Sequence, residues 1–300
     1  MVGNPQTYDI TAMGALLIDF MQDTGDDHGR ALFERSPGGA PCRILSAAHS
    51  SGMKTALIGK VGNDIHGRYL RRELDREGID VSNVTLTGAA YTTILFEIYD
   101  ADGKRRKDYA RRPGADTQLS FRDIDKNVLR NTKILHIDSQ LLTEEPSRTT
   151  IFRAIKEAEE SGAYISYEPR YEAELWGDQE IAVARIQSVL PYVDLLRLTE
   201  EEALLLTQCP SPEEAAKYLI DNGVRLVVIT MSNRGVYAAT KNAAAEVCWR
   251  YSDGKKTESA IDTFWGGFLA AFLDAGNTPE DMEKKDLEKN LQMGRKKAHL

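Results

Sequence analysis

The chain has 300 residues, a mass of 33.4 kDa, a formal net charge of −8 at pH 7 and a sequence pI near 5.3. Nucleic-acid binding depends mainly on Lys and Arg contacts to phosphates, so this acidic balance argues against a nucleic-acid partner. No apolar run approaches the ~20 residues of a membrane span, and the first residues lack the pattern of a secretory signal, so we expect a cytoplasmic protein without a membrane partner. The three cysteines are far apart and suggest neither a zinc motif nor a disulfide framework.

Residues 8–20 are mostly apolar and predict one buried first strand that ends near Asp19. A carboxylate at the end of a buried strand in an α/β sheet is well placed to face a ligand. The alternative is an aspartate that only forms a turn.

Two glycines, Gly38 and Gly39, lie in a segment that ends at Arg43 and is followed by a predicted helix that continues to Ser51. Glycines at this position allow a ligand to approach the backbone closely. A second strand over 54–61 and a helix to about residue 77 follow.

Residues 92–100 and 107–111 are strand-like and flank an Asp-Gly pair, which predicts a β-hairpin. Arg111 at its end is a candidate substrate contact. The alternative assigns it to a solvated cluster of basic residues at 104–107.

From residue 132 onwards, strands and helices alternate regularly, which predicts a mostly parallel sheet with helices on both faces in a single domain over 1–300. Ligands of such sheets lie beyond the carboxyl ends of the strands. The residues just past each predicted strand are therefore candidates for a site, among them Glu168 and Arg170 after the strand over 164–167.

The stretch 260–273 has an apolar face at helical spacing, and Gly276 is a plausible stop. We expect Asp262 and Thr263 to cap the start of this helix, where free N–H groups can hold a phosphate.

Several of these segments resemble the PfkB, or ribokinase-like, carbohydrate kinases, most closely the fructokinases. The resemblance is carried by the Gly38-Gly39 segment, by Gly62 to Gly67, by Arg111 to Asp116, by Leu196 to Glu202, by Thr230 to Gly235 and by the 260–273 stretch. It implies a ribokinase-like α/β fold with a small β-lid formed by about 19–37 and 90–112. It also implies MgATP-dependent phosphorylation of a sugar and a homodimer formed through the lid.

Family roles follow residue by residue from the resemblance. The implied contacts to the sugar are Asp19, Gly38, Gly39, Arg43, Arg111, Glu168 and Arg170. The implied contacts to the nucleotide are Arg197, Thr230, Ser232, Gly235, Thr263 and Gly266, and Glu202 supports Mg²⁺. Arg43 and Arg170 stand where relatives have asparagine, and Ser232 stands where they have glycine.

The family's signature is D-T-x-G-A-G-D-x-F-x-G-G-F. With Asp262-Thr263 taken as its opening pair, the chain runs straight into Phe264, so the G-A-G-D turn and its catalytic aspartate are missing. Loss of such a base slows a reaction ~10²–10⁴-fold. The sequence therefore leaves open a weak or inactive sugar kinase and a non-catalytic relative that binds or senses an anionic sugar through Arg43, Arg111 and Arg170.

Overall fold

The computed structural model describes residues 8–23, 31–100, 102, 104–249 and 258–300. The first seven residues and Gly103 of the predicted hairpin turn lie outside this range. Its strands are β1 (Tyr8–Met13), β2 (Leu17–Gln22), β3 (Phe33–Gly38), β4 (Thr55–Gly62), β5 (Asp80–Thr87), β6 (Thr93–Tyr99), β7 (Arg105–Ala110), β8 (Thr132–Asp138), β9 (Tyr164–Glu168), β10 (Leu195–Thr199), β11 (Leu226–Thr230), β12 (Val236–Thr240) and β13 (Ala244–Val247). Its α-helices are α1 (Ala40–His49), α2 (Ile65–Arg76), α3 (Lys126–Arg130), α4 (Ser147–Glu159), α5 (Ala173–Trp176), α6 (Gln179–Gln187), α7 (Glu200–Thr207), α8 (Pro212–Asp221), α9 (Glu258–Ala275) and α10 (Lys284–Lys297).

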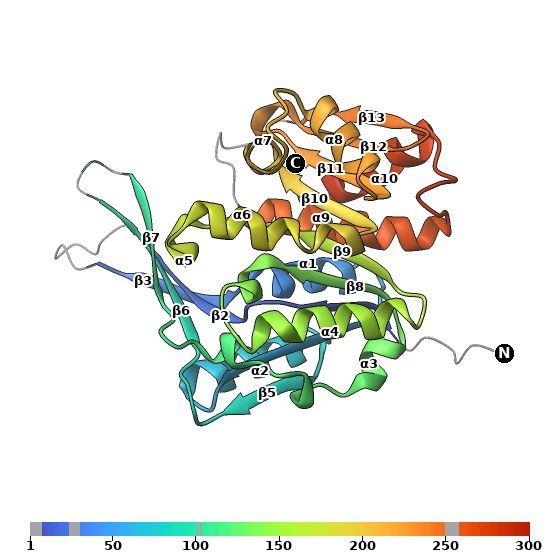
Figure 1. Ribbon diagram of the computed structural model, residues 1–300. Helices are drawn as coiled ribbons and strands as arrows, with labels where there is room; N and C mark the ends of the chain where they lie inside the picture. Colours follow the sequence, from blue (N-terminus) through green and yellow to red (C-terminus); the bar gives the residue numbers. More distant parts are fainter. Residues whose placement is uncertain (1–7, 24–30, 101, 103, 250–257) are drawn as a thin grey trace.

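The predicted α/β fold is confirmed. Nine strands form the main sheet in the order β13-β12-β11-β10-β9-β8-β1-β4-β5, and the seven from β11 to β5 are parallel. The strands β12 and β13 extend the edge in antiparallel fashion. Helices cover both faces of this sheet, as a buried parallel sheet requires (Figure 1).

Two hydrophobic clusters separate the faces. One joins α1, α2, α9 and α10 to the sheet, and the other joins α3, α4, α6, α7 and α8 to it. Adjacent strand residues contribute to opposite clusters, as Ile134 and Leu135 do on β8. This alternation follows from the two-residue period of a strand.

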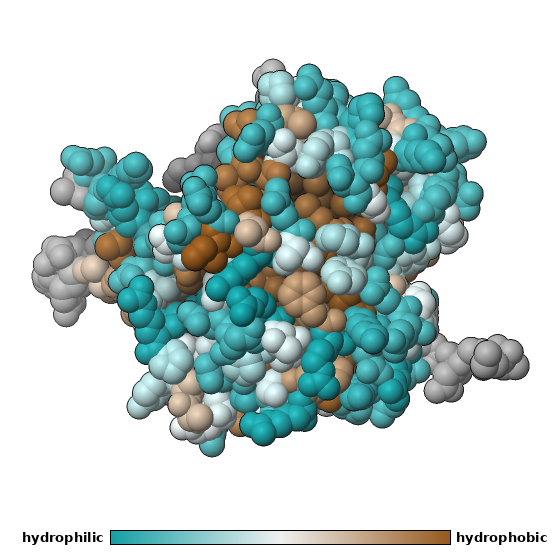
Figure 2. Space-filling view, in the orientation of Figure 1, coloured by the Kyte–Doolittle hydropathy of each residue, from teal (hydrophilic) through white to brown (hydrophobic). Residues whose placement is uncertain are grey.

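A second sheet of four strands, β3-β2-β6-β7, projects from one side of the main sheet (Figure 1). The predicted hairpin is present, because β6 and β7 pair antiparallel from Ile94 with Ala110 to Tyr99 with Arg105. We call this second sheet the lid. In Figure 2 the end of the lid that carries β7 is hydrophilic, whereas hydrophobic side chains gather across the middle of the same face around α5 and α6.

The prediction of one first strand over 8–20 is wrong. The chain leaves the main sheet after Met13 and enters the lid at Leu17, so Asp19 belongs to β2 of the lid. The apolar pattern continues through both strands because both are buried on their inner sides, and it therefore conceals the break.

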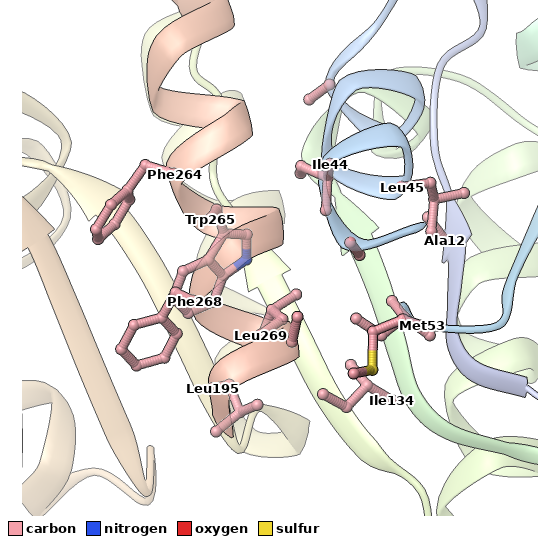
Figure 3. Packing of buried hydrophobic residues seen from close by; sticks show 14 of the residues in the cluster. Ala12, Ile44, Leu45, Met53, Ile134, Leu195, Phe264, Trp265, Phe268 and Leu269 are labelled. Carbon is pink, nitrogen blue, oxygen red and sulfur yellow. The ribbon is translucent and has the colours of Figure 1, made fainter. Parts of the chain in front are cut away.

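The prediction that Asp262 and Thr263 cap a helix is also wrong. Helix α9 begins at Glu258, so Asp262 lies in its second turn. The predicted stop is correct, because Gly276 follows Ala275 with a positive φ of 67°. Phe264, Trp265, Phe268 and Leu269 of α9 pack into the core, with Phe264 and Phe268 on the side of α9 turned away from α1 (Figure 3).

Gly266 allows α9 to lie close to α1. A Cβ added at this glycine would lie 2.2 Å from the backbone oxygen of Ile44. This close contact between the helices explains why position 266 is a glycine. Nothing in the geometry brings Gly266 to a nucleotide, as the resemblance implied.

The substitution Gly266→Ala should lower the free energy of unfolding by about 1–3 kcal/mol, because the added methyl group forces two backbones apart. Chemical denaturation measures the change. Gly88→Ala is the matched control, since no heavy atom lies within 4 Å of its added Cβ, and it should stay within about 0.5 kcal/mol of the parent. Equal stability of the two variants would contradict this account of α9.

Candidate active site

Two cavities meet where the lid faces the carboxyl ends of the parallel strands. The lid cavity, of about 630 Å³, lies between β2, β6 and β7 of the lid and the start of α1. The strand-end cavity, of about 570 Å³, lies beyond β9 and β10 and beside α7. Both are lined by Arg105, Arg170 and Glu258, and we call these three residues the junction.

Asp262 is the buried acid beside the junction. Its carboxylate is wholly buried, and each oxygen accepts a hydrogen bond from a different arginine. Arg43 Nε donates to Oδ2 at 2.8 Å, and Arg170 Nη1 donates to Oδ1 at 2.8 Å. We call this arrangement the arginine clamp.

Each arginine of the clamp has further acidic partners. Arg43 Nη1 also donates to Asp19 Oδ2 at 3.1 Å. Arg170 lies 3.5 Å from Glu258 and 3.8 Å from Glu168. Buried charges are stable only when they are paired, and removal of one partner is strongly destabilising. The clamp therefore ties together the lid, α1, α9 and the loop after β9.

The backbone of Arg170 is strained. Its φ is 41°, in the left-handed region that non-glycine residues rarely adopt. Such a conformation costs of order 1–3 kcal/mol and persists only where surrounding contacts enforce it. The contacts to Asp262 and its neighbours provide that enforcement, which places strain at the meeting point of the two cavities.

Asp19 supplies an open acceptor in the lid cavity. Its Oδ1 is buried and has no hydrogen-bond partner among the described residues, while Oδ2 is held by Arg43. Burial raises the pKa of Asp19, and the Arg43 charge opposes that rise. Gly38 fits against it without a side chain, because a Cβ there would lie 2.4 Å from Oδ1. Gly39 has a φ of 93° and also lines the cavity.

Two predicted sugar contacts lie elsewhere. Arg111 binds Asp116, Thr143 and the carbonyl of Gln140, and it lines neither cavity. The structure therefore does not bring Arg111 together with Arg43 and Arg170 at one cavity. Glu168 is wholly buried and supports Arg197, whose Nη1 donates to its Oε1 at 3.1 Å.

The predicted nucleotide residues are divided between different places. Arg197 lines the strand-end cavity, and its Nη2 donates to buried Thr230 at 3.3 Å. Ser232 has a φ of 45°, the conformation a glycine adopts without strain, and Gly235 has a φ of 115° and packs against the Val247 carbonyl. Thr263 lies inside α9, so its N–H faces the carbonyl one turn earlier rather than a ligand.

Glu202 lines the strand-end cavity and caps α7. Its Oε2 accepts the N–H of Thr199 at 2.8 Å, and its Oε1 accepts the N–H of Tyr171 at 3.0 Å. Both oxygens are thus used by the backbone, and a metal could reach them only through their remaining lone pairs or through water. Among the described residues, no group of three or more His, Cys, Asp or Glu is arranged to hold a metal ion.

Sequence reasoning missed Asp262 as a site residue because it took the wrong register. Counting back four residues from Gly266-Gly267 in the pattern D-x-F-x-G-G-F gives Asp262-Thr263-Phe264-Trp265-Gly266-Gly267-Phe268. Asp262 thus matches the second aspartate of the signature, and Ser259-Ala260-Ile261 stands in place of G-A-G. The residue spacing alone could have revealed this. Glu258, Lys107 and Glu172 were also missed, since nothing in the sequence brings β7, α5 and α9 together.

The comparisons with known proteins agree with this geometry. Residues 8–300 match the model of the pfkB family carbohydrate kinases. The chain belongs to the pfkB family. It is 30% identical over 281 residues to probable fructokinase-5 of Arabidopsis thaliana, covering 92% of this chain and 86% of the relative.

Solved structures of sugar kinases share the fold. A double mutant of fructokinase from Vibrio cholerae O395, crystallised with fructose, ADP and potassium, has a TM-score of 0.83 and 25% identity and covers 97% of this chain and 91% of its own. An uncharacterised sugar kinase from Pyrococcus horikoshii in complex with ATP has a TM-score of 0.78 and 26% identity, covering 96% and 90%. Within the described part of this pfkB chain, no helix has both the length and the hydropathy needed to cross a bilayer.

The pH dependence of stability should report the buried Glu168. Burial raises its pKa from 4.5 to about 7, and the charges of Arg197 and Arg170 only partly oppose this. The folded state then holds the proton more tightly than the unfolded state, so the free energy of unfolding should fall as the pH rises from about 4.5 to 7. Glu168→Gln, which cannot titrate, should make that fall shallower in denaturation curves taken at several pH values.

Glu174→Gln is the control for this measurement, because it removes an exposed carboxylate from the neighbouring helix α5. This variant should keep the parent's pH profile. A Glu168→Gln profile that matches the parent's would show that Glu168 does not titrate in this range.

Proposed function

We propose that this chain is a fructokinase-like sugar kinase that binds a neutral hexose in the lid cavity and ATP in the strand-end cavity, and whose phosphoryl transfer is slow because Asp262 is held by the arginine clamp. The observation that carries the proposal is the position of Asp262. It matches the signature's second aspartate and lies where the two cavities meet.

Charge balance favours a neutral sugar over an anionic one. The lid cavity is lined by three cations, Arg43, Arg105 and Arg170, and by three carboxylates, Asp19, Glu97 and Glu258. Arg105 binds Glu97 directly, and Arg43 binds Asp19. The arginines therefore have internal partners, and an anionic substituent would have to displace them. The free Oδ1 of Asp19 suits a sugar hydroxyl donor.

ATP and Mg²⁺ fit the strand-end cavity in part. Four cations line it: Arg105, Lys107, Arg170 and Arg197. They could hold phosphate oxygens, and Glu202 could hold Mg²⁺ through water. When bound, the metal would offset phosphate charge, which matters because five carboxylates line the same cavity, namely Glu172, Glu201, Glu202, Glu258 and Asp262.

The chain's own residues then act at the junction. Asp19 orients the sugar, and Asp262 accepts the proton of the attacking hydroxyl once one arginine of the clamp moves away. Both oxygens of Asp262 are already taken by guanidinium donors, so a sugar hydroxyl can reach neither until one arginine moves. Arg170 would remain beside the transferring group and offset its charge.

A non-catalytic sugar-binding role is the second candidate. The observation that favours it is the first turn of α9, which is helical from Glu258 where the family signature has a glycine turn. Such turns supply free N–H groups to developing charge, and loss of one such donor slows a reaction ~10²–10³-fold.

Opening the clamp should raise catalysis. In a coupled assay for ADP release with fructose and MgATP, we expect slow turnover by the parent. Arg43→Asn, which restores the family's residue, should increase kcat several-fold because it frees Asp262 Oδ2. Asp262→Asn should lower turnover ~10²–10⁴-fold while fructose binding in calorimetry persists.

Arg68→Asn is the matched control, because Arg68 contacts only Asn63 among the bonds described for its side chain. It should leave turnover unchanged. Fructose binding without any turnover, in the parent and in Arg43→Asn alike, would reject the kinase and favour the second candidate.

We also propose that two copies of this chain, acting in the cytoplasm, associate through the lid. Exposed apolar side chains occur on two of its strands and beside one of them, with Ile98 of β6 at 38%, Phe33 of β3 at 40% and Leu32 just before β3 at 47% exposure. An open sheet with exposed apolar residues invites pairing with another copy. Light scattering should give a mass near twice 33.4 kDa for the parent and near 33.4 kDa for Ile98→Glu. A monomeric parent would contradict the dimer.

A further inference from the structure

Glu258 holds a position between the two cavities that suits an anion. It is the first residue of the 18-residue helix α9, where the helix dipole favours negative charge. Its Oε1 lies 2.5 Å from Lys107 Nζ, and its Oε2 lies 3.5 Å from Arg170 Nη2. Glu258 lines both cavities, as Arg105 and Arg170 do.

The cations around Glu258 come from elements that are far apart in the sequence. Lys107 belongs to β7 of the lid, and Arg170 to the loop after β9. Arg170 has 9% of its side chain exposed, and its Nε has no hydrogen-bond partner among the described residues. A buried donor without a partner is expensive, so a further acceptor at this place would be stabilised.

Electrostatics agree with this arrangement. Burial acts to raise the pKa of Glu258, but the charges of Arg170, Lys107 and Arg105 outweigh it and lower the pKa to about 2. The carboxylate is thus ionised throughout the physiological range. Lys107 keeps a second partner, because Glu172 Oε1 lies 2.9 Å from its Nζ.

We propose that Glu258 is an internal competitor for a phosphoryl group: its carboxylate occupies the cationic place between Lys107 and Arg170 that a phosphate of the substrate nucleotide must take during transfer. The inference rests on the proposed function, because a phosphoryl group passes between the cavities only in a kinase. It adds a residue that limits access to the site, separate from the clamp on Asp262.

The charge count of the strand-end cavity supports competition rather than cooperation. With Glu258 present, five carboxylates face four cations, and without it the two are equal in number. A phosphate that enters beside Glu258 meets a like charge at short range. A phosphate that replaces it gains the contacts to Lys107 and Arg170 that Glu258 now makes.

Calorimetric titration with inorganic phosphate, without sugar or nucleotide, tests the proposal. At constant ionic strength, Glu258→Gln should bind phosphate about tenfold more tightly than the parent, because the amide keeps the shape and removes the competing charge. The double variant Glu258→Gln, Lys107→Met should lose this gain. An increase of less than threefold in Glu258→Gln would overturn the proposal.

Glu145→Gln is the matched control. Glu145 is also an acid at the start of a helix, α4, and is paired with an arginine, Arg148. It should bind phosphate as the parent does, and a gain equal to that of Glu258→Gln would overturn the proposal by showing a general effect of charge. If Glu258→Gln does not fold, Glu258→Ser takes its place with the same expected gain.

The readout separates this inference from the proposed function. Tighter phosphate binding by Glu258→Gln without sugar phosphorylation in any variant would support the competitor role and reject the kinase. Turnover by the parent together with unchanged phosphate binding in Glu258→Gln would support the kinase and reject the competitor role.

Discussion

The contact of Asp262 with Arg43 and Arg170 is the constraint on which the rest of the site depends. A fully buried carboxylate is tolerated only when strong donors compensate its lost hydration. Two guanidinium groups supply that compensation from opposite sides, at 2.8 Å each. Because Arg43 lies on α1 and Arg170 follows β9, the pair fixes how α9 sits against both. The strained backbone of Arg170 is held in place by the same contacts.

The clamp is also part of a series of ion pairs among the residues that line the two cavities. Arg170 joins Asp262 to Glu258, and Lys107 joins Glu258 to Glu172, so alternating charges follow one another along the strand-end cavity. Two of these residues, Arg170 and Glu258, also line the lid cavity. The boundary between the two cavities is therefore formed in part by side chains. Side chains can exchange partners at lower cost than a fold can rearrange, so this boundary can change without a change of fold.

The sequence predicted the architecture well because periodicity depends on local burial. The alternation of strands and helices after residue 132, the β6–β7 hairpin and the stop at Gly276 all arise from local rules of spacing and turn chemistry. The break between β1 and β2 escaped prediction, since both strands are apolar and only the path of the chain separates them.

The site was predicted less completely because its charges are paired over long distances. Sequence reasoning singled out Arg43 and Arg170, but it took their common partner, Asp262, for a helix cap. The neighbouring sequence does not show whether an arginine binds a ligand anion or a buried carboxylate 219 residues away. The same holds for Arg111. Its partner Asp116 is only five residues away, yet the sequence did not show that the two side chains bind each other.

The helical first turn of α9 and the clamp are best understood together. In the helix α9, which spans Glu258–Ala275, the N–H of Asp262 pairs with a carbonyl one turn earlier. Asp262 thus lies about one turn, or ~5.4 Å, along the helix from Glu258. A buried carboxylate at that depth needs positive partners from other elements, and Arg43 and Arg170 provide them. Glu258 occupies the end of the helix itself, so the clamp on Asp262 and the contacts of Glu258 with Lys107 and Arg170 follow from the same placement of α9.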